Sequence, residues 1–184
     1  MGVDGSGKTT LAKKLQNTIK GSKYLHLKPY IVFQDRRTVI KDPHHQKKSM
    51  FMMSLLRMFS WLISYKVFFY QSKIKKTYIF DRYAHDVLID PLRYKHNLPK
   101  RLTKFILNFF PEPDLWIFLN PSLKTVESRK NELSNNELRR QIKDYSQFFR
   151  NKKNVLKLNT DINKEKLLSN ITKAISIFIK QRKL

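Results

Sequence analysis

The segment Gly2-Val3-Asp4-Gly5-Ser6-Gly7-Lys8-Thr9 combines residue types that are suited to holding phosphate groups. Glycines let the backbone curl so that successive N–H groups point at oxygen atoms, and a helix that begins at the lysine adds its positive end. The lysine of such a loop reaches the outer phosphates of a nucleoside triphosphate, and the threonine hydroxyl is a Mg²⁺ ligand. The pattern predicts a site for Mg-ATP formed by Gly2, Asp4, Gly5, Ser6, Gly7, Lys8, Thr9 and Thr10.

A second pair of candidate residues, Asp81 and Arg82, directly follows the apolar run 77–80. A carboxylate at the end of a buried strand can hold Mg²⁺ beside phosphates, so Thr9 and Asp81 are the predicted metal ligands. An arginine next to it can bind an acceptor phosphate through two N–H groups at once. On its own the dipeptide is also compatible with a surface ion pair. The phosphate-binding loop elsewhere in the chain favours the interpretation as a metal and acceptor site.

Length and composition limit the possible classes of protein. The chain of 184 residues is long enough for one domain with a sizeable core, and it contains no cysteine for disulfides or thiolate metal sites. The lack of cysteine is compatible with a reducing cytosol, and we expect a cytoplasmic protein. The net charge is +24, but the lysines are scattered, which favours a solvated surface over a specific nucleic-acid site.

Residues 50–70 form the most apolar segment, and Arg57 and Lys66 interrupt it. No uncharged run approaches the roughly 18 residues of a membrane span. We therefore expect a buried or partly buried helix. Peripheral contact of this segment with a membrane or a partner, or a homodimer, stays open as an alternative.

The elements that must position the candidate residues follow from hydrophobic periodicity. Helices are predicted over 9–20, 48–74, 101–110 and 122–132, around Leu138–Phe149, and after an N-cap at Asp161. Gly21 is expected to end the first of these helices. Short apolar strands are predicted over 24–27, 77–80, 115–119 and 154–158, and a loop over 30–47. Strands that alternate with helices predict an α/β fold with a parallel sheet covered on both faces.

Together the two motifs resemble the thymidylate kinase-like group of nucleoside monophosphate kinases. Further segments that resemble a divergent branch of this group, found among bacterial surface-polysaccharide genes, are HLKP at 26–29, DPLRY at 90–94, PDLWIFLNP at 113–121 and RKNELSNNELRRQIKDY at 129–145. The resemblance implies a single P-loop NTPase domain over 1–184, a three-layer sandwich with a central parallel sheet. A strand normally leads into the loop, but here the loop begins at residue 2. We therefore expect a sheet without its first strand, in a chain that is truncated or recorded from an internal methionine.

The resemblance also implies roles for matching positions. Lys8 and Thr9 would bind phosphate and metal, Asp4 would lie near the acceptor sugar, and Arg82 would hold the acceptor phosphate beside Asp81. Arg129 would close over the transferred group from a lid at roughly 129–140, which also contains Arg139 and Arg140. His44 and His45 are interpreted as plain loop residues.

Two segments depart from the family pattern, and both would frame the nucleotide. Leu27-Lys28-Pro29-Tyr30 stands in place of Arg-Glu-Pro-Gly-Gly-Thr, and residues 84–90 replace a serine and a Tyr-Gln pair. The expected function is thus ATP-dependent phosphoryl transfer to a nucleoside monophosphate. The alternatives are a kinase of a sugar or another cell-surface precursor, and an inactive nucleotide-binding remnant that docks on a membrane or partner.

Overall fold

The computed structural model describes residues 1–27, 48–72, 77–128, 134–161 and 163–181. The described strands are β1 (Lys23–Leu25), β2 (Tyr78–Phe80), β3 (Trp116–Asn120) and β4 (Val155–Asn159). The described helices are α1 (Lys8–Thr18), α2 (Phe51–Gln71), α3 (Lys100–Leu107), α4 (Leu123–Glu127), α5 (Asn135–Arg150) and α6 (Lys164–Gln181). Short 3₁₀ helices, η1 (Ala84–Leu88) and η2 (Leu92–Tyr94), follow β2. The predicted alternation of strands and helices is confirmed. The bounds differ from the predicted ones by at most three residues, except that the helix predicted over 122–132 is described as α4 only as far as Glu127.

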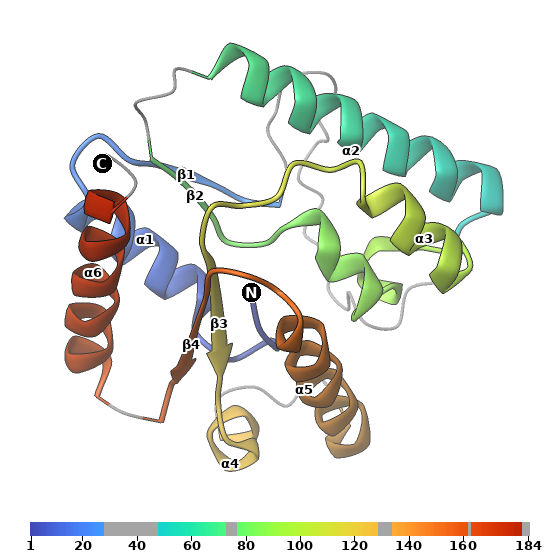
Figure 1. The fold of residues 1–184 in the computed structure, drawn as a ribbon. Coiled ribbons are helices and arrows are strands. Elements are labelled where there is room, and N and C mark those ends of the chain that lie inside the picture. The colour runs from blue at the N-terminus through green and yellow to red at the C-terminus, as the bar shows by residue number, and fades with distance from the viewer. Residues whose placement is uncertain (28–47, 73–76, 129–133, 162, 182–184) are drawn as a thin grey trace.

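The described strands form two parallel pairs, β1 with β2 and β3 with β4 (Figure 1). The backbone of Met1 adds to the second pair, because its nitrogen donates to the Ile117 oxygen at 2.7 Å and its oxygen accepts from the Leu119 nitrogen at 3.0 Å. This is the hydrogen-bond pattern of parallel neighbours. The parallel α/β class is therefore confirmed, while one continuous central sheet stays a prediction.

Both faces of β3 are covered by helices, as expected for a buried parallel strand. Trp116 and Phe118 belong to a core cluster that includes residues of α2, α3 and α5. Leu119, on the opposite face, packs with Leu11 and Leu15 of α1 and with residues of α6. Because side chains alternate along a strand, this one element joins two cores and separates two helical layers.

Two predicted details of the helix ends are wrong. The last helix begins at Lys164, so Asn163 caps it, and the Asn163 side-chain oxygen accepts from the Glu165 nitrogen at 2.8 Å. Asp161 instead accepts hydrogen bonds from the Ser122 nitrogen, at 3.1 and 3.2 Å. The first helix ends at Thr18, before the predicted Lys20, and Gly21 turns the chain toward β1 with a φ of 76°.

The predicted loop over 30–47, with His44 and His45, lies outside the described residues. The segment 50–70 does form a long helix, α2, which lies along the edge of the molecule in Figure 1. Within the described ranges, no helix has the length and apolar character needed to cross a membrane.

Candidate active site

The phosphate-binding loop runs from Gly2 to the start of α1 and bends on its glycines. A Cβ atom at Gly2 would lie 2.6 Å from the Leu119 oxygen, so only glycine lets the loop pass this close to β3. Gly7 has a φ of 88°, a left-handed conformation that turns the chain directly into α1. The N–H groups of the first turn of α1 therefore face the loop, as an anion site requires. Ser6 is buried in the loop, whereas Thr10 is exposed on α1.

Lys8 is buried within this loop and turns back onto it. Its Nζ donates to the Val3 oxygen at 2.7 Å and pairs with Asp4 at 3.3 Å. Burial and the charge of Arg82 lower the pKa of Lys8 to about 8, although Asp4 acts in the opposite direction. The ammonium is thus held in the loop by a carbonyl oxygen and a carboxylate oxygen, which phosphate oxygens could replace.

Thr9 and Asp81, the two predicted metal ligands, are neighbours in the structure. The Thr9 hydroxyl donates to the Asp81 Oδ2 at 2.7 Å, and the Tyr24 hydroxyl donates to the same oxygen at 3.0 Å. The His26 Nδ1 lies 3.3 Å from it. Burial opposes the ionisation of Asp81, but the hydrogen bonds from His26 and Thr9 and the Arg82 charge outweigh it and hold its pKa well below its usual range.

The second oxygen of Asp81 is buried and makes no hydrogen bond with the described residues. An ionised carboxylate with one unused oxygen beside a threonine hydroxyl suits a hard cation such as Mg²⁺. No cluster of three metal-binding side chains occurs in the described part of the chain, so phosphate oxygens and water would complete the coordination. The residues therefore fit a magnesium ion carried in with a nucleotide.

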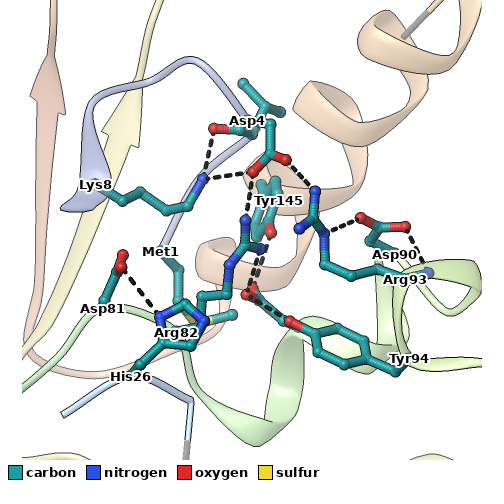
Figure 2. Close-up of polar contacts among 12 residues, drawn as sticks. Met1, Asp4, Lys8, His26, Asp81, Arg82, Asp90, Arg93, Tyr94 and Tyr145 are labelled. Atoms are coloured by element: carbon teal, nitrogen blue, oxygen red, sulfur yellow. Dashed lines mark hydrogen bonds and ion pairs between the residues drawn. The ribbon is translucent and has the colours of Figure 1, made fainter. Parts of the chain in front are cut away.

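Arg82 lies at the centre of a buried network of ion pairs (Figure 2). Its Nη2 pairs with Asp4, and its Nη1 lies 3.4 Å from the Asp86 Oδ2. Burial disfavours the charged guanidinium, but its electrostatic interactions with Tyr94, Asp4 and Asp86 outweigh this effect and raise the pKa of Arg82. Asp4 thus receives a cation from each side, Lys8 within its own loop and Arg82 from the end of β2.

Several residues of this network were missed by sequence reasoning. Arg93 pairs with Asp4 and, through its Nε at 2.9 Å, with Asp90. The hydroxyls of Tyr145 and Tyr94 donate to Asp86 at 2.8 and 3.4 Å. The signals in the sequence were two segments that had entered only as part of the resemblance. DPLRY contains Asp90, Arg93 and Tyr94, and RKNELSNNELRRQIKDY ends at Tyr145.

The predicted lid residues are not all brought to this network. Arg129 lies outside the described residues. Arg139 is exposed on α5. Arg140 binds the Glu137 and Asp144 carboxylates at 2.7 Å each and donates to the Ile89 oxygen at 2.8 Å. These contacts tie α5 to the segment after η1, a structural role in the arrangement seen here.

The chain matches a known protein family over almost its whole length. A family model described as "Thymidylate kinase" matches residues 2–177. No curated protein sequence matches the chain.

Solved structures share the fold at low sequence identity. Thymidylate kinase from Candida albicans has 18% identity and a TM-score of 0.63 over 99% of this chain and 89% of that one. Deoxyadenosine kinase from M. mycoides with bound dCTP has 18% identity and a TM-score of 0.62 over 96% of both chains. The same enzyme with bound dATP has 17% identity and a TM-score of 0.60, again over 96% of each.

Proposed function

Because the chain belongs to the thymidylate kinase family, we propose that it transfers a phosphoryl group from Mg-ATP to a nucleoside monophosphate. The observation that carries the proposal is the pairing of Asp4 with Lys8 and Arg82. One carboxylate joins a cation of the phosphate-binding loop to a cation at the end of β2. Two anionic substrates held by these cations would lie next to each other, as phosphoryl transfer requires.

The donor end would consist of the loop residues Gly2 to Thr10. Lys8 is already buried and would exchange the Val3 oxygen and Asp4 for phosphate oxygens. Thr9 and Asp81 would hold Mg²⁺, which supplies charge neutralisation for the transferred group. Arg129 would contribute a further cation from the lid, and this part of the proposal rests on the family resemblance alone.

The acceptor end would be Arg82, with Asp4 near the acceptor sugar. The Arg82 guanidinium is buried and held by Asp4 and Asp86, so its fork is already oriented before an acceptor arrives. Preorganised charge of this kind is the main contribution that a protein makes to phosphoryl transfer, since the covalent chemistry belongs to the nucleotide. Because ATP is the donor, the proposal places the protein in the cytoplasm.

The proposal includes a P-loop kinase sandwich in which both strand pairs belong to one central parallel sheet. The parallel pairing of Met1 supports it, because residue 1 occupies the side of β3 that β4 leaves open. The loop therefore starts at the position that a strand between the two pairs would occupy.

Thymidylate itself is not the acceptor that we favour. Residues 84–88, which replace the nucleotide-framing segment of the family, form η1, and Ala84, His85, Asp86 and Val87 are buried. Phosphate binding by an arginine depends on charge and is less affected by such replacements than selectivity between bases. A polar site that recognises a base can supply up to about 10⁴-fold selectivity, and this selectivity is lost when its residues are replaced. We expect thymidylate to be no better than other nucleoside monophosphates.

A panel of acceptors with Mg-ATP tests the function. It contains nucleoside monophosphates, sugars and, because a similar structure is a deoxyadenosine kinase, deoxyadenosine. Wild-type protein is compared with Arg82→Lys, which keeps the charge but loses the planar two-pronged donor, and with Arg150→Lys, an exposed arginine outside the site, as control. We expect kcat/KM for the best monophosphate to fall in Arg82→Lys alone.

Other outcomes separate the alternatives. A preference for thymidylate by orders of magnitude would restore the plain family activity, and transfer only to sugars or nucleosides would replace the acceptor class. Unchanged transfer by Arg82→Lys would remove Arg82 from the acceptor site. ATP binding without transfer to any member of the panel would favour the inactive remnant.

A further inference from the structure

The hydrogen bonds of the Asp81 carboxylate are concentrated on one of its two oxygens. The hydroxyls of Thr9 and Tyr24 donate to Oδ2 at 2.7 and 3.0 Å, and the His26 Nδ1 lies 3.3 Å from the same oxygen. The other oxygen, Oδ1, is buried and makes no hydrogen bond with the described residues. Three donors thus share one oxygen of a carboxylate whose second oxygen is left for another partner.

Two of these donors reach Asp81 because of the register of two neighbouring strands. β1 and β2 are parallel, Leu25 pairs with Phe80, and the Asp81 nitrogen donates to the Leu25 oxygen at 3.0 Å. Tyr24 and His26 are two residues apart, so their side chains lie on the same side of the chain. Figure 2 shows the His26 ring directed at Asp81. The strand pair therefore brings a tyrosine and a histidine, both outside the two sequence motifs, to the predicted metal site.

The chemistry of the carboxylate fixes the role of each partner. An ionised carboxylate accepts hydrogen bonds and donates none, so the Nδ1 of His26 carries the proton in this contact. The Thr9 hydroxyl gives its proton to Oδ2 and keeps its lone pairs for a cation. Outer hydrogen bonds of this kind hold the plane and the orientation of a carboxylate that binds a metal. They leave Oδ1 as the oxygen that Asp81 can offer.

Burial of the charge does not by itself require this distribution. A carboxylate has acceptor sites on both oxygens, and a buried oxygen without a partner costs free energy, so a purely structural carboxylate is expected to use both. The Asp81 side chain is fully buried, whereas that of His26 is 49% exposed. The site therefore borders on solvent, from which an ion can enter.

From the three donors on Oδ2, we propose that Tyr24 and His26 position Asp81 as a one-oxygen ligand and so select Mg²⁺ over Ca²⁺. This inference rests on the proposed use of Mg-ATP. Mg²⁺ requires a near-ideal octahedral shell, whereas Ca²⁺ accepts a looser shell that can include both oxygens of one carboxylate. With Oδ2 occupied, Asp81 offers a single fixed oxygen. The two residues of β1 thus act on the metal without touching it.

Calorimetric titrations of the full chain with ATP, in Mg²⁺, in Ca²⁺ and in EDTA, test the proposal. Tyr24→Phe/His26→Leu removes both donors, and Tyr78→Phe on the neighbouring strand β2 is the matched control. We expect the double variant to bind ATP about tenfold more weakly in Mg²⁺, with a smaller loss in Ca²⁺ and none in EDTA. The control should match the wild type. Tyr24→Phe/His26→Asn, which restores a donor near the Nδ1 position, should recover part of the affinity in Mg²⁺.

Four results would overturn the proposal in whole or in part. Equal affinity of the wild type and the double variant in Mg²⁺ would mean that the two residues do not act on the metal. An equal loss in Mg²⁺, Ca²⁺ and EDTA would make them structural supports of the phosphate-binding loop. No recovery in the asparagine variant would remove His26. A wild type that binds ATP equally well in Mg²⁺ and in EDTA would remove the metal site itself.

Failure of this inference is distinguishable from failure of the proposed function, because only ATP binding is measured. A protein that transfers phosphate to no acceptor can still show the expected loss in Mg²⁺, and an active kinase can show none. Thermal unfolding checks that each variant is folded. Tyr24→Phe alone, which removes one hydroxyl, repeats the test with the least change in packing.

Discussion

The network around Asp4 and the outer face of α2 are opposites. In the first, charged side chains are buried: the Arg82 side chain is 10% exposed and that of Asp86 is fully buried. In the second, large apolar side chains such as Leu56 and Ile63 face solvent. Folding alone favours neither arrangement. Burying charges costs free energy, and leaving apolar surface exposed gives up the favourable free energy of burying it. The comparison suggests that both regions are kept for binding, one for phosphate and one for an apolar surface.

The largest effect is expected from breaking the buried network. Arg82→Ala removes the cation shared by Asp4 and Asp86 and leaves two carboxylates with fewer partners. We expect the free energy of unfolding to fall by about 3–5 kcal/mol, measured by urea denaturation. Arg139→Ala, at an exposed position on α5, should change it by less than about 0.5 kcal/mol. A similar loss of unfolding free energy in the two variants would mean that the buried network does not contribute more to stability than an exposed arginine does.

The next effect concerns ligand affinity at the same network. Lys8→Ala should weaken ATP binding by about a hundredfold or more, since a charged hydrogen-bond donor contributes about 1.5–3 kcal/mol and Lys8 makes more than one contact. Lys8→Arg should not restore affinity, because a planar fork does not fit a closed loop. Calorimetric titration with Mg-ATP measures both, and equal affinity for wild type and Lys8→Ala would remove Lys8 from the site.

A smaller effect is expected from pH. The pKa of Lys8 is lowered to about 8, so the free protein loses this charge between pH 7 and pH 9, and ATP affinity should fall about tenfold over that range. The sign is opposite for folding. The unfolded chain keeps the proton up to the usual lysine pKa of 10.5, so the free energy of unfolding rises with pH between about 8 and 10.5. Lys8→Ala should show a flat affinity profile, and a pH dependence that persists in it would assign the titration to another group.

The smallest effect sharpens the other side of the comparison. Ile63→Ser on the outer face of α2 should change the free energy of unfolding by less than about 0.5 kcal/mol, because the side chain is already half exposed. Tyr65, two residues away and fully buried, provides the control, since Tyr65→Ala should be strongly destabilising. A large loss in Ile63→Ser would mean that the face contributes to the fold itself.

Local patterns predicted most of the elements. The apolar period along α5, with Leu138, Tyr145 and Phe149 buried, is a property of consecutive residues and needs no knowledge of the fold. Helix ends were less accurate, since the side-chain oxygens of both Asp161 and Asn163 are suitable caps and only the path of the chain decides between them.

The site was predictable where its residues are contiguous. Gly2 to Thr9 form one motif, whereas Tyr145 reaches Asp86 across 59 residues and Arg93 reaches Asp4 across 89. A buried charge in the middle of a sequence is not visible as such, because its burial depends on elements that come from elsewhere in the chain. The network around Asp86 therefore required the structure.

The ion pairs of Asp4 mean that anion binding at this site is an exchange of one anion for another. Lys8, Arg82 and Arg93 are already paired with the Asp4 carboxylate, so an incoming anion must compete with it for these cations. The net affinity is then the difference between two sets of contacts, which discriminates against weakly held anions such as chloride. The same competition favours release of the product nucleotide, because the Asp4 carboxylate can pair with the cations again as the nucleotide leaves.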